Sequence, residues 1–347
     1  MPDPFISIII TIFNKEKTLE DSIKSALYQN YDRKEIIAID DGSTDGSLKI
    51  CEKYKNYIKL YSKGNGGQVS AANIGFIHSK GDIIIILDAD DLLKDGALYE
   101  VSNLWHPDFP LIFWSMEIIN ITGNCIGNII PKHFLSNSYE YRKFVERYGY
   151  FPGPPQSGYA YNRWFLEIYM PLDEKKWVGG MDGLFAISSV FHGNIKWTSN
   201  ILAEYRIDQS SVSHSASLSY DKMMVRFMKY SAQYDKILYN FITKEDNSVL
   251  YFYKGNFIKT PHYWQLRISL RKTKDYHYPF NDTFLEVIWW SFRSCILSPW
   301  IPLRARIGFL TVNFFIIVST KKHLRHSLPK LRQNGSVDFI LSFFKRN

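Results

Sequence analysis

Acidic side chains follow two apolar segments in the first hundred residues. One apolar run ends in Asp40-Asp41, and another ends in Asp88-Ala89-Asp90-Asp91. In an extended chain the side chains at positions i and i+2 point the same way, so Asp88 and Asp90 present their carboxylates together. This pair is typical of a site for a hard divalent cation that substrate phosphates also bind. Asp45 and Asp95, by contrast, are more simply explained as turn formers or helix caps.

The apolar segments alternate with stretches of helical periodicity. Four short runs of apolar, mostly β-branched residues are predicted strands: 5–13, 35–39, 58–61 and 82–87. Helical spacing is found in 19–27 and 69–78, and Ser43-Thr44-Asp45 can cap a further helix. Strands that are apolar on both faces and separated by helices predict a doubly wound, mostly parallel α/β sheet. In such sheets ligands bind beyond the carboxyl ends of the strands, where the acidic residues lie.

The usual backbone loops for binding phosphate are missing from this domain. The first predicted strand is followed by Asn14-Lys15-Glu16-Lys17, with neither GxGxxG nor GxxxxGK[ST]. A partial match, residues 64–69, follows the third strand instead and lacks the last glycine. These differences argue against a redox dinucleotide site and a P-loop. We expect a metal on Asp88 and Asp90 to neutralise any phosphate-bearing donor.

Four segments together resemble a known family. The runs ISIIITIFNKEKTL, IIAIDDGSTDGS, NGGQVSAANIG and GDIIIILDADD are similar, in order and spacing, to family 2 inverting glycosyltransferases of the GT-A fold. The resemblance implies a nucleotide-sugar donor, with a UDP-sugar favoured, and Mn²⁺ or Mg²⁺ on the DxD motif Asp88-Ala89-Asp90. It also implies a set of donor-binding residues, with the loop Gly66-Gly67-Gln68 beside them: Thr11, Asn14, Glu16, Asp40, Asp41, Asn73, Asp88 and Ala89.

The resemblance continues more weakly to about residue 213. PPQSGYAYNR, residues 154–163, is similar to the acceptor-side pattern PPTSGNAFRR. The later run MPLDEKKWVGGMDGLF implies Asp182 as the general base, with a helix N-cap after Gly179-Gly180 as the alternative. Met181 precedes Asp182 where many relatives carry an acidic residue. Tyr205-Arg206-Ile207-Asp208 stands where YR-x-His is usual. We expect Asp208 to serve as a third metal ligand in place of the histidine, and Arg206 either to help hold the donor diphosphate or to form a structural ion pair.

The last hundred residues differ in charge from the rest. From Tyr251 onward there are sixteen Lys or Arg against four Asp or Glu, a balance of +12, whereas the first 250 residues carry −4. Apolar and aromatic residues are interleaved with this charge, which favours a membrane surface over nucleic acid. The longest uncharged apolar stretch, Ile307 to Thr320, is shorter than the ~20 residues of a membrane span. We expect helices lying in the membrane interface; a buried helical subdomain or a subunit interface is the alternative.

The sequence predicts four regions and a cytoplasmic location. They are a donor half, an acceptor half, a helical extension and a basic, aromatic C-terminal region: residues 1–105, 106–215, 216–282 and 283–347. Three widely spaced cysteines and an N-terminus without the features of a signal peptide indicate a reducing compartment. The basic, aromatic C-terminal region then predicts a location at the inner face of the cell membrane.

The predicted function is glycosyl transfer with inversion to a glycan or lipid-linked acceptor, in surface polysaccharide synthesis. A catalytically inactive nucleotide-sugar-binding or scaffold protein is the first alternative, and the intact Asp88, Asp90 and Asp182 argue against it. A sugar nucleotidyltransferase is the second, but it would need a glycine- and lysine-rich phosphate loop after the first strand. Oligomeric state, donor sugar and linkage stay open.

Overall fold

The computed structural model describes residues 3–148, 150–175, 177, 180–207 and 283–297, with residues 307, 310, 311, 313, 314, 316 and 317. The chain divides into two compact units, one of residues 1–142 with 151–208 and one of residues 143–150 with 209–347. The expected helical extension, residues 216–282, lies outside the described residues, as does most of 298–347. The predicted boundaries at residues 105, 215 and 282 therefore stay predictions.

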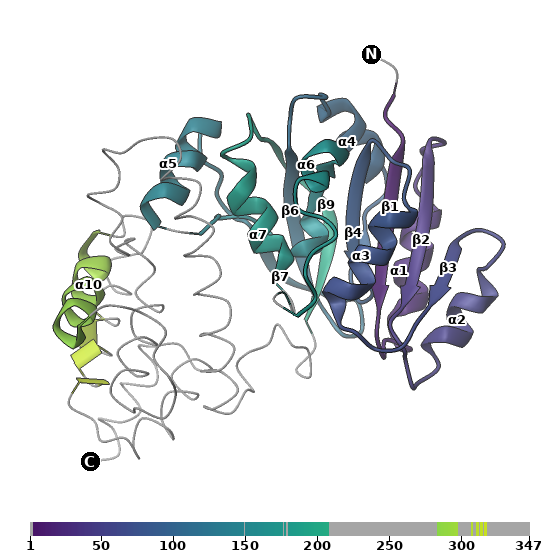
Figure 1. The fold of residues 1–347 in the computed structure, drawn as a ribbon, viewed down its shortest axis with the longest axis horizontal. Coiled ribbons are helices and arrows are strands. Elements are labelled where there is room, and N and C mark those ends of the chain that lie inside the picture. The colour runs from purple at the N-terminus through teal and green to yellow at the C-terminus, as the bar shows by residue number, and fades with distance from the viewer. Residues whose placement is uncertain are drawn as a thin grey trace. The chain divides into compact units, whose positions relative to one another are not determined.

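The first unit begins with the predicted alternation of strands and helices. Four parallel strands lie in the order β3-β2-β1-β4 (Figure 1). They are β1 (Ile6–Ile12), β2 (Lys34–Asp40), β3 (Lys59–Ser62) and β4 (Ile83–Asp88). The helices between them are α1 (Leu19–Leu27), α2 (Ser47–Lys53) and α3 (Gln68–His78). The predicted doubly wound half of the fold is confirmed.

Side chains alternate between the two faces of a strand, and in β1 and β4 both faces are buried. Ile8 and Ile10 of β1 belong to the same apolar core as Leu19 and Ile23 of α1. Ile9 points to the other face, where α3 packs on the sheet. A Cβ atom on Gly75 of α3 would collide with the Ile9 side chain, so only glycine allows α3 to approach β1 this closely.

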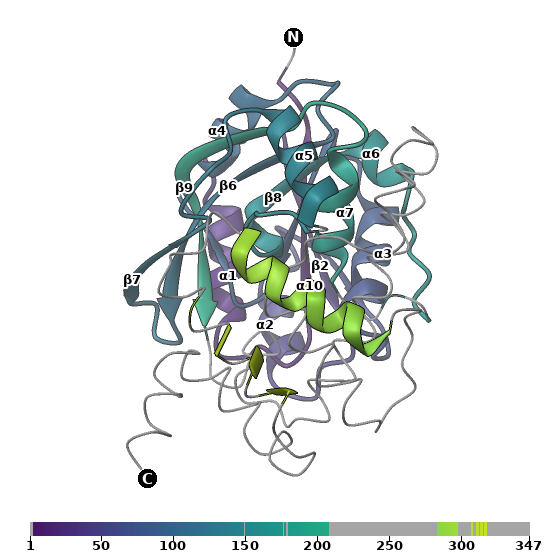
Figure 2. The ribbon, with the colours of Figure 1, turned by 90° about the vertical axis from the view of Figure 1, so that its left-hand side faces the viewer.

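The remaining strands make the sheet mixed rather than mostly parallel. β8 (Tyr159–Asn162) lies antiparallel between β4 and β6 (Leu111–Asn120), and β9 (Lys196–Ile207) runs parallel to β6. The short β5 (Leu92–Leu93) pairs with β9, and β7 (Cys125–Ile130) forms a hairpin with β6 (Figure 2). The parallel arrangement is thus concentrated in the first half of the sheet, and an antiparallel strand joins it to the second.

Four further helices of the first unit and its border are α4 (Ala97–Leu104), α5 (Ser138–Tyr148), α6 (Arg163–Glu167) and α7 (Met181–Ser189), with a 3₁₀ turn at Gln156–Gly158. In the second unit the structure describes α10 (Phe284–Leu297), which exposes Leu285, Trp289 and Ile296 and buries Val287 and Cys295. Within the described residues, no helix combines the length and apolarity needed to cross a membrane.

Candidate active site

The carboxylates of Asp88 and Asp90 lie where β4 ends. The Gln68 side-chain amide, at the start of α3, donates a hydrogen bond to Asp88 Oδ1 over 2.7 Å. The Asp88 backbone N–H donates to Ser157 Oγ at 3.0 Å, which ties the end of β4 to the 3₁₀ turn. Asp90 forms an ion pair with Lys15, from the loop that follows β1. Elements from both halves of the sheet therefore hold this acidic segment.

Negative charge at this point exceeds the positive charge that faces it. Burial, together with the charges of Asp90 and Asp182, raises the pKa of Asp88 to about 7. The same causes, burial first and then the charges of Asp88 and Asp90, raise the pKa of Asp91 well above its usual value. Asp91 Oδ1 accepts a hydrogen bond from the Arg206 backbone N–H, while its buried Oδ2 has no hydrogen-bond partner in the described part of the chain.

This donor set fits a hard divalent cation. Carboxylate oxygens are the ligands that Mg²⁺ and Mn²⁺ prefer, and a bound cation would relieve the repulsion that raises the pKa of Asp88. The described residues supply Asp88 and Asp90 for this purpose but no cluster of three or more acidic, His or Cys ligands. The third expected ligand, Asp208, lies outside the described residues.

Asp182 comes to this site from the other half of the unit. It lies in the first turn of α7, half-buried, after Gly180 in a left-handed conformation. Its charge is close enough to raise the pKa of Asp88, although the two residues are far apart in the sequence. The fold therefore brings the proposed base into electrostatic contact with the DxD motif.

Asp40 and Asp41 are both buried at the end of β2, and their carboxylates bind protein groups. Asp40 accepts hydrogen bonds from Ser62 Oγ at 3.0 Å and from the Ser43 N–H at 3.3 Å. Asp41 forms an ion pair with Lys63 at 2.6 Å and accepts from the backbone N–H groups of residues 66 and 67 at 3.0 and 2.7 Å. Asp41 thereby shapes the glycine loop that leads into α3 and Gln68.

Residues after β1 connect that strand end with the loop after β2. Asn14, in the left-handed region with φ of 52°, accepts a hydrogen bond from the Thr44 N–H at 2.8 Å. Glu16 Oε2 accepts from the Gly46 N–H at 2.7 Å. Thr11 lies opposite Asp88 in the β1–β4 register, nearly buried. These three expected donor-binding residues thus gather at the same rim as Ala89, which is buried between the two aspartates of the motif.

The side chains of Asn73 and Arg206, two further expected donor-binding residues, bind backbone groups of segments far along the chain. The Arg206 side chain, only 4% exposed, donates from Nε to the Asp90 carbonyl at 2.9 Å and from Nη1 to the Ile121 carbonyl at 2.8 Å. Arg206 therefore holds the backbone of the DxD segment in place through the Asp90 carbonyl. Asn73 binds the backbone of Leu172 in the acceptor half.

Lys15 and Ser157 contact the aspartates but were not among the expected site residues, whereas Gln68, which donates to Asp88, belongs to the loop expected beside the site. Lys15 was detectable in principle, as a basic residue directly after the first strand and hence at the same rim. Ser157 contacts Asp88 because the 3₁₀ turn packs beside β4, and no local pattern in the sequence predicts that packing.

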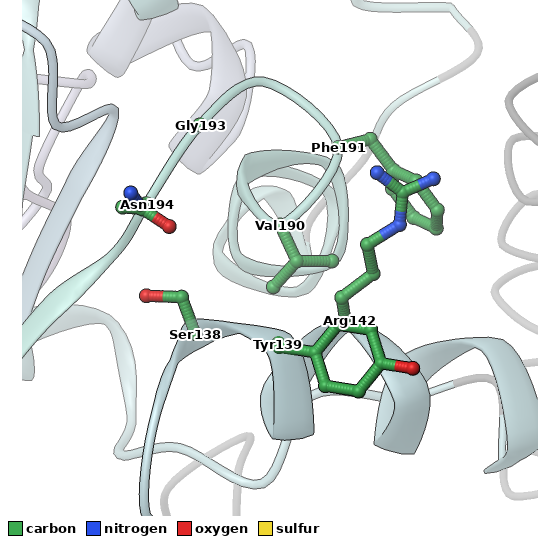
Figure 3. Close-up of a pocket in the computed structure, with 7 residues that line it drawn as sticks. All are labelled: Ser138, Tyr139, Arg142, Val190, Phe191, Gly193 and Asn194. Carbon is green, nitrogen blue, oxygen red and sulfur yellow. The ribbon is translucent and has the colours of Figure 1, made fainter.

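A separate hollow of about 320 Å³ lies between α5 and the segment after α7 (Figure 3). Ser138, Tyr139 and Arg142 line one side, and Phe191 and Asn194 the other, with the Arg142 guanidinium 5.3 Å from the centre of the Phe191 ring. The hollow adjoins the C-terminal end of α7, whereas Asp182 is in its first turn, about 12 Å away at 1.5 Å per residue. It is therefore distinct from the acidic site.

Several known proteins are similar in sequence to parts of this chain. The family model described as glycosyl transferase family 2 matches residues 7–163. An uncharacterized glycosyltransferase of Nostoc sp. is 31% identical over 217 residues, 61% of this chain and 67% of that protein. The cholesterol galactosyltransferase of Borreliella burgdorferi is 42% identical over 101 residues, 28% of each chain. The chain thus spans two thirds of the first relative and less than a third of the second.

Solved structures share the fold at low sequence identity. Staphylococcus aureus TarS in complex with UDP-GlcNAc matches with a TM-score of 0.52 and 16% identity, over 94% of this chain and 91% of that one. The mannosyltransferase of Pyrobaculum calidifontis, in complex with GDP-Man and Mn²⁺, matches with a TM-score of 0.50 and 13% identity, over 99% and 86%.

Proposed function

Since the chain belongs to glycosyl transferase family 2 and is a glycosyltransferase of the GT-A fold, we propose that it transfers a sugar from a nucleotide-sugar to a hydroxyl acceptor with inversion. The observation that carries the proposal is the carboxylate pair of Asp88 and Asp90 at the end of β4, with Asp182 of α7 close enough for its charge to raise the pKa of Asp88. Inversion requires one displacement, and hence one base on the acceptor side and a stabilised leaving group on the donor side.

The donor side of the proposal rests on the rim formed by the loops after β1, β2 and β4. Asp88 and Asp90 would hold Mn²⁺ or Mg²⁺, which when bound supplies charge stabilisation to the leaving nucleoside diphosphate. The buried Asp40 and Asp41 shape the loops around the nucleotide, with Thr11, Asn14 and Glu16 beside them. The Mn²⁺ complex of the Pyrobaculum enzyme and the UDP-GlcNAc complex of TarS support a metal and a nucleotide-sugar. A UDP-sugar is favoured by the family resemblance.

The acceptor side of the proposal rests on Asp182. As a half-buried carboxylate near the DxD motif, it can accept the proton of an attacking hydroxyl. No second carboxylate is required as a nucleophile, because inversion involves no covalent sugar intermediate. Arg206 stabilises the donor side indirectly, through the Asp90 carbonyl.

We further propose a glycan or lipid-linked acceptor, in surface polysaccharide synthesis, that the protein meets at the inner membrane surface. The exposed Leu285, Trp289 and Ile296 of α10 and the +12 balance after Tyr251 support association with an anionic bilayer. A donor half of residues 1–105 and an acceptor half of residues 106–215 stay part of this proposal.

Hydrolysis of a panel of nucleotide-sugars tests the proposed function. Purified full-length protein with Mn²⁺ or Mg²⁺ should release nucleoside diphosphate slowly from one donor class, and the released sugar should have the opposite anomeric configuration. Asp90→Asn should abolish this release and weaken nucleoside diphosphate binding while the protein stays folded. Full turnover in excess chelator would refute the metal, and retained configuration would refute inversion. Binding of a donor without any turnover would favour the inactive nucleotide-sugar-binding protein.

A further inference from the structure

Asn73 makes a two-way hydrogen-bonded contact with a backbone segment far along the chain. Its Nδ2 donates to the Leu172 carbonyl and its Oδ1 accepts from the Leu172 N–H, each over 2.8 Å. Nδ2 also lies 3.3 Å from Glu174 Oε1. Asn73 and Leu172 are both buried, and 99 residues separate them in the sequence. The side chain thus satisfies both backbone groups of Leu172, as a neighbouring strand would.

The contact begins on a helix that is fixed in place. α3 packs closely on β1 through Gly75, two residues after Asn73, and its first residue, Gln68, binds Asp88. α3 therefore has a fixed position relative to the DxD segment. Through its hydrogen bonds, Asn73 therefore anchors the Leu172 backbone to a helix of fixed position.

The contact ends on the segment that leads to Asp182. Leu172 lies two residues after the buried Met170, and the Asp173 carbonyl accepts a hydrogen bond from the Trp177 N–H at 2.8 Å. The segment then leads to Gly180 and the start of α7. Between the end of α6 at Glu167 and the start of α7 at Met181 the described residues form no helix or strand. A loop of this kind needs side-chain contacts to hold one conformation.

We propose that Asn73 is a positioning residue that fixes the loop before α7, and through it the place of Asp182 relative to the donor. The inference rests on the proposed role of Asp182 as the base. It assigns Asn73 to the link between the two halves of the site rather than to direct contact with the nucleotide, because both N–H groups of its amide already face protein acceptors.

Limited proteolysis and amide exchange test the link without requiring turnover. Lys175 is exposed on the loop, and Lys175-Lys176 offers trypsin a cleavage site. In Asn73→Ala the two buried backbone groups of Leu172 lose their partners, so trypsin cleavage in this loop and amide exchange of residues 172–175 should accelerate about 10- to 100-fold. Asn73→Asp should behave similarly, because it cannot donate to the Leu172 carbonyl. Asn103→Ala, an exposed asparagine of α4, is the matched control and should equal wild type.

Kinetics then separate positioning from nucleotide binding. Asn73→Ala should lower kcat about 10-fold or more, with the KM for donor and the Kd for nucleoside diphosphate within about twofold of wild type. A loop that stays as protected as in wild type would overturn the proposal, and so would a defect confined to nucleoside diphosphate affinity. If the wild-type protein hydrolyses no donor, the proposed function fails, while the proteolysis and exchange results still decide whether Asn73 holds the loop.

Discussion

The Lys15 ammonium group pairs with the Asp90 carboxylate, joining the loop after β1 to the DxD segment 75 residues later. The lysine places a single positive charge where the proposed metal would bind. Metal binding then has to displace or share this contact, and the displaced ammonium becomes available to a phosphate of the donor. Lys15 and the metal are thus expected to compete in the free protein and to cooperate once donor is bound.

Removing Lys15 should therefore change metal and donor affinity in opposite directions. In Lys15→Met, Mn²⁺ should bind the free protein about 3- to 10-fold more tightly, because Asp90 loses a competing cation. Nucleoside diphosphate should bind more weakly in the presence of Mn²⁺. Isothermal titration calorimetry measures both affinities. Lys17→Met, an equal loss of charge at an exposed position two residues away, is the control. Unchanged Mn²⁺ affinity in Lys15→Met would place the metal elsewhere.

The raised pKa of Asp88 predicts a pH-dependent cost to stability. Because the folded protein holds this proton up to about pH 7, whereas an unfolded aspartate loses it near its ordinary value, the folded state binds more protons between those values. Stability should therefore fall as pH rises from about 4 to 7. Asp88→Asn removes the ionisation, so it should be more stable than wild type at pH 8, by about 1–3 kcal/mol, and by much less at pH 4.5.

Urea unfolding at the two pH values measures this difference. Asp95→Asn, which removes one exposed charge a few residues further on, controls for net charge. A stability gain in Asp88→Asn that is the same at pH 4.5 and pH 8 would mean that the gain does not come from the carboxylate's ionisation. Added Mn²⁺ should stabilise the wild type more at pH 8 than at pH 4.5, because protons and metal compete for Asp88.

Asp182→Asn tests the base. The amide keeps the size of the carboxylate but cannot accept the acceptor's proton, so transfer should fall by about 10²–10⁴. Nucleoside diphosphate affinity should persist, since the donor side is held by other residues. The same substitution removes a charge that raises the pKa of Asp88, and that pKa should therefore decrease. Kinetics of transfer, together with calorimetry for the diphosphate, provide the readout, and near wild-type transfer would exclude Asp182 as the base.

The exposed apolar residues of α10 predict binding to anionic membranes. Leu285, Trp289 and Ile296 are 77%, 62% and 62% exposed, and basic residues near a surface add about 1 kcal/mol each. Full-length protein should co-float with anionic liposomes, at low salt more than at high salt. Replacing the three residues by serine should abolish the liposome binding that remains at high salt. Serine at the exposed Tyr28, Tyr57 and Ile77 of the first unit is the control. Full-length protein that never co-floats would favour a subunit interface.

The sequence by itself determined the first half of the fold and the location of its acidic rim. Each predicted strand and helix of residues 5–87 is present within a few positions, because burial on both faces and helical spacing are local properties. The carboxylates of Asp40 and Asp88 then had to lie at one edge, since parallel strands place their carboxyl ends together.

Only the tertiary structure decided which side chains meet at that rim. Lys15 with Asp90 and Asn73 with Leu172 are contacts between segments far apart in the sequence, and Asp182 lies close enough to Asp88 for its charge to raise the pKa of Asp88. The same holds for β8, which joins the parallel strands to β6 by antiparallel pairing. Such contacts depend on how helices and loops pack once strand order is set. A buried side chain such as Arg206 therefore binds whichever backbone carbonyls the packing brings within its reach.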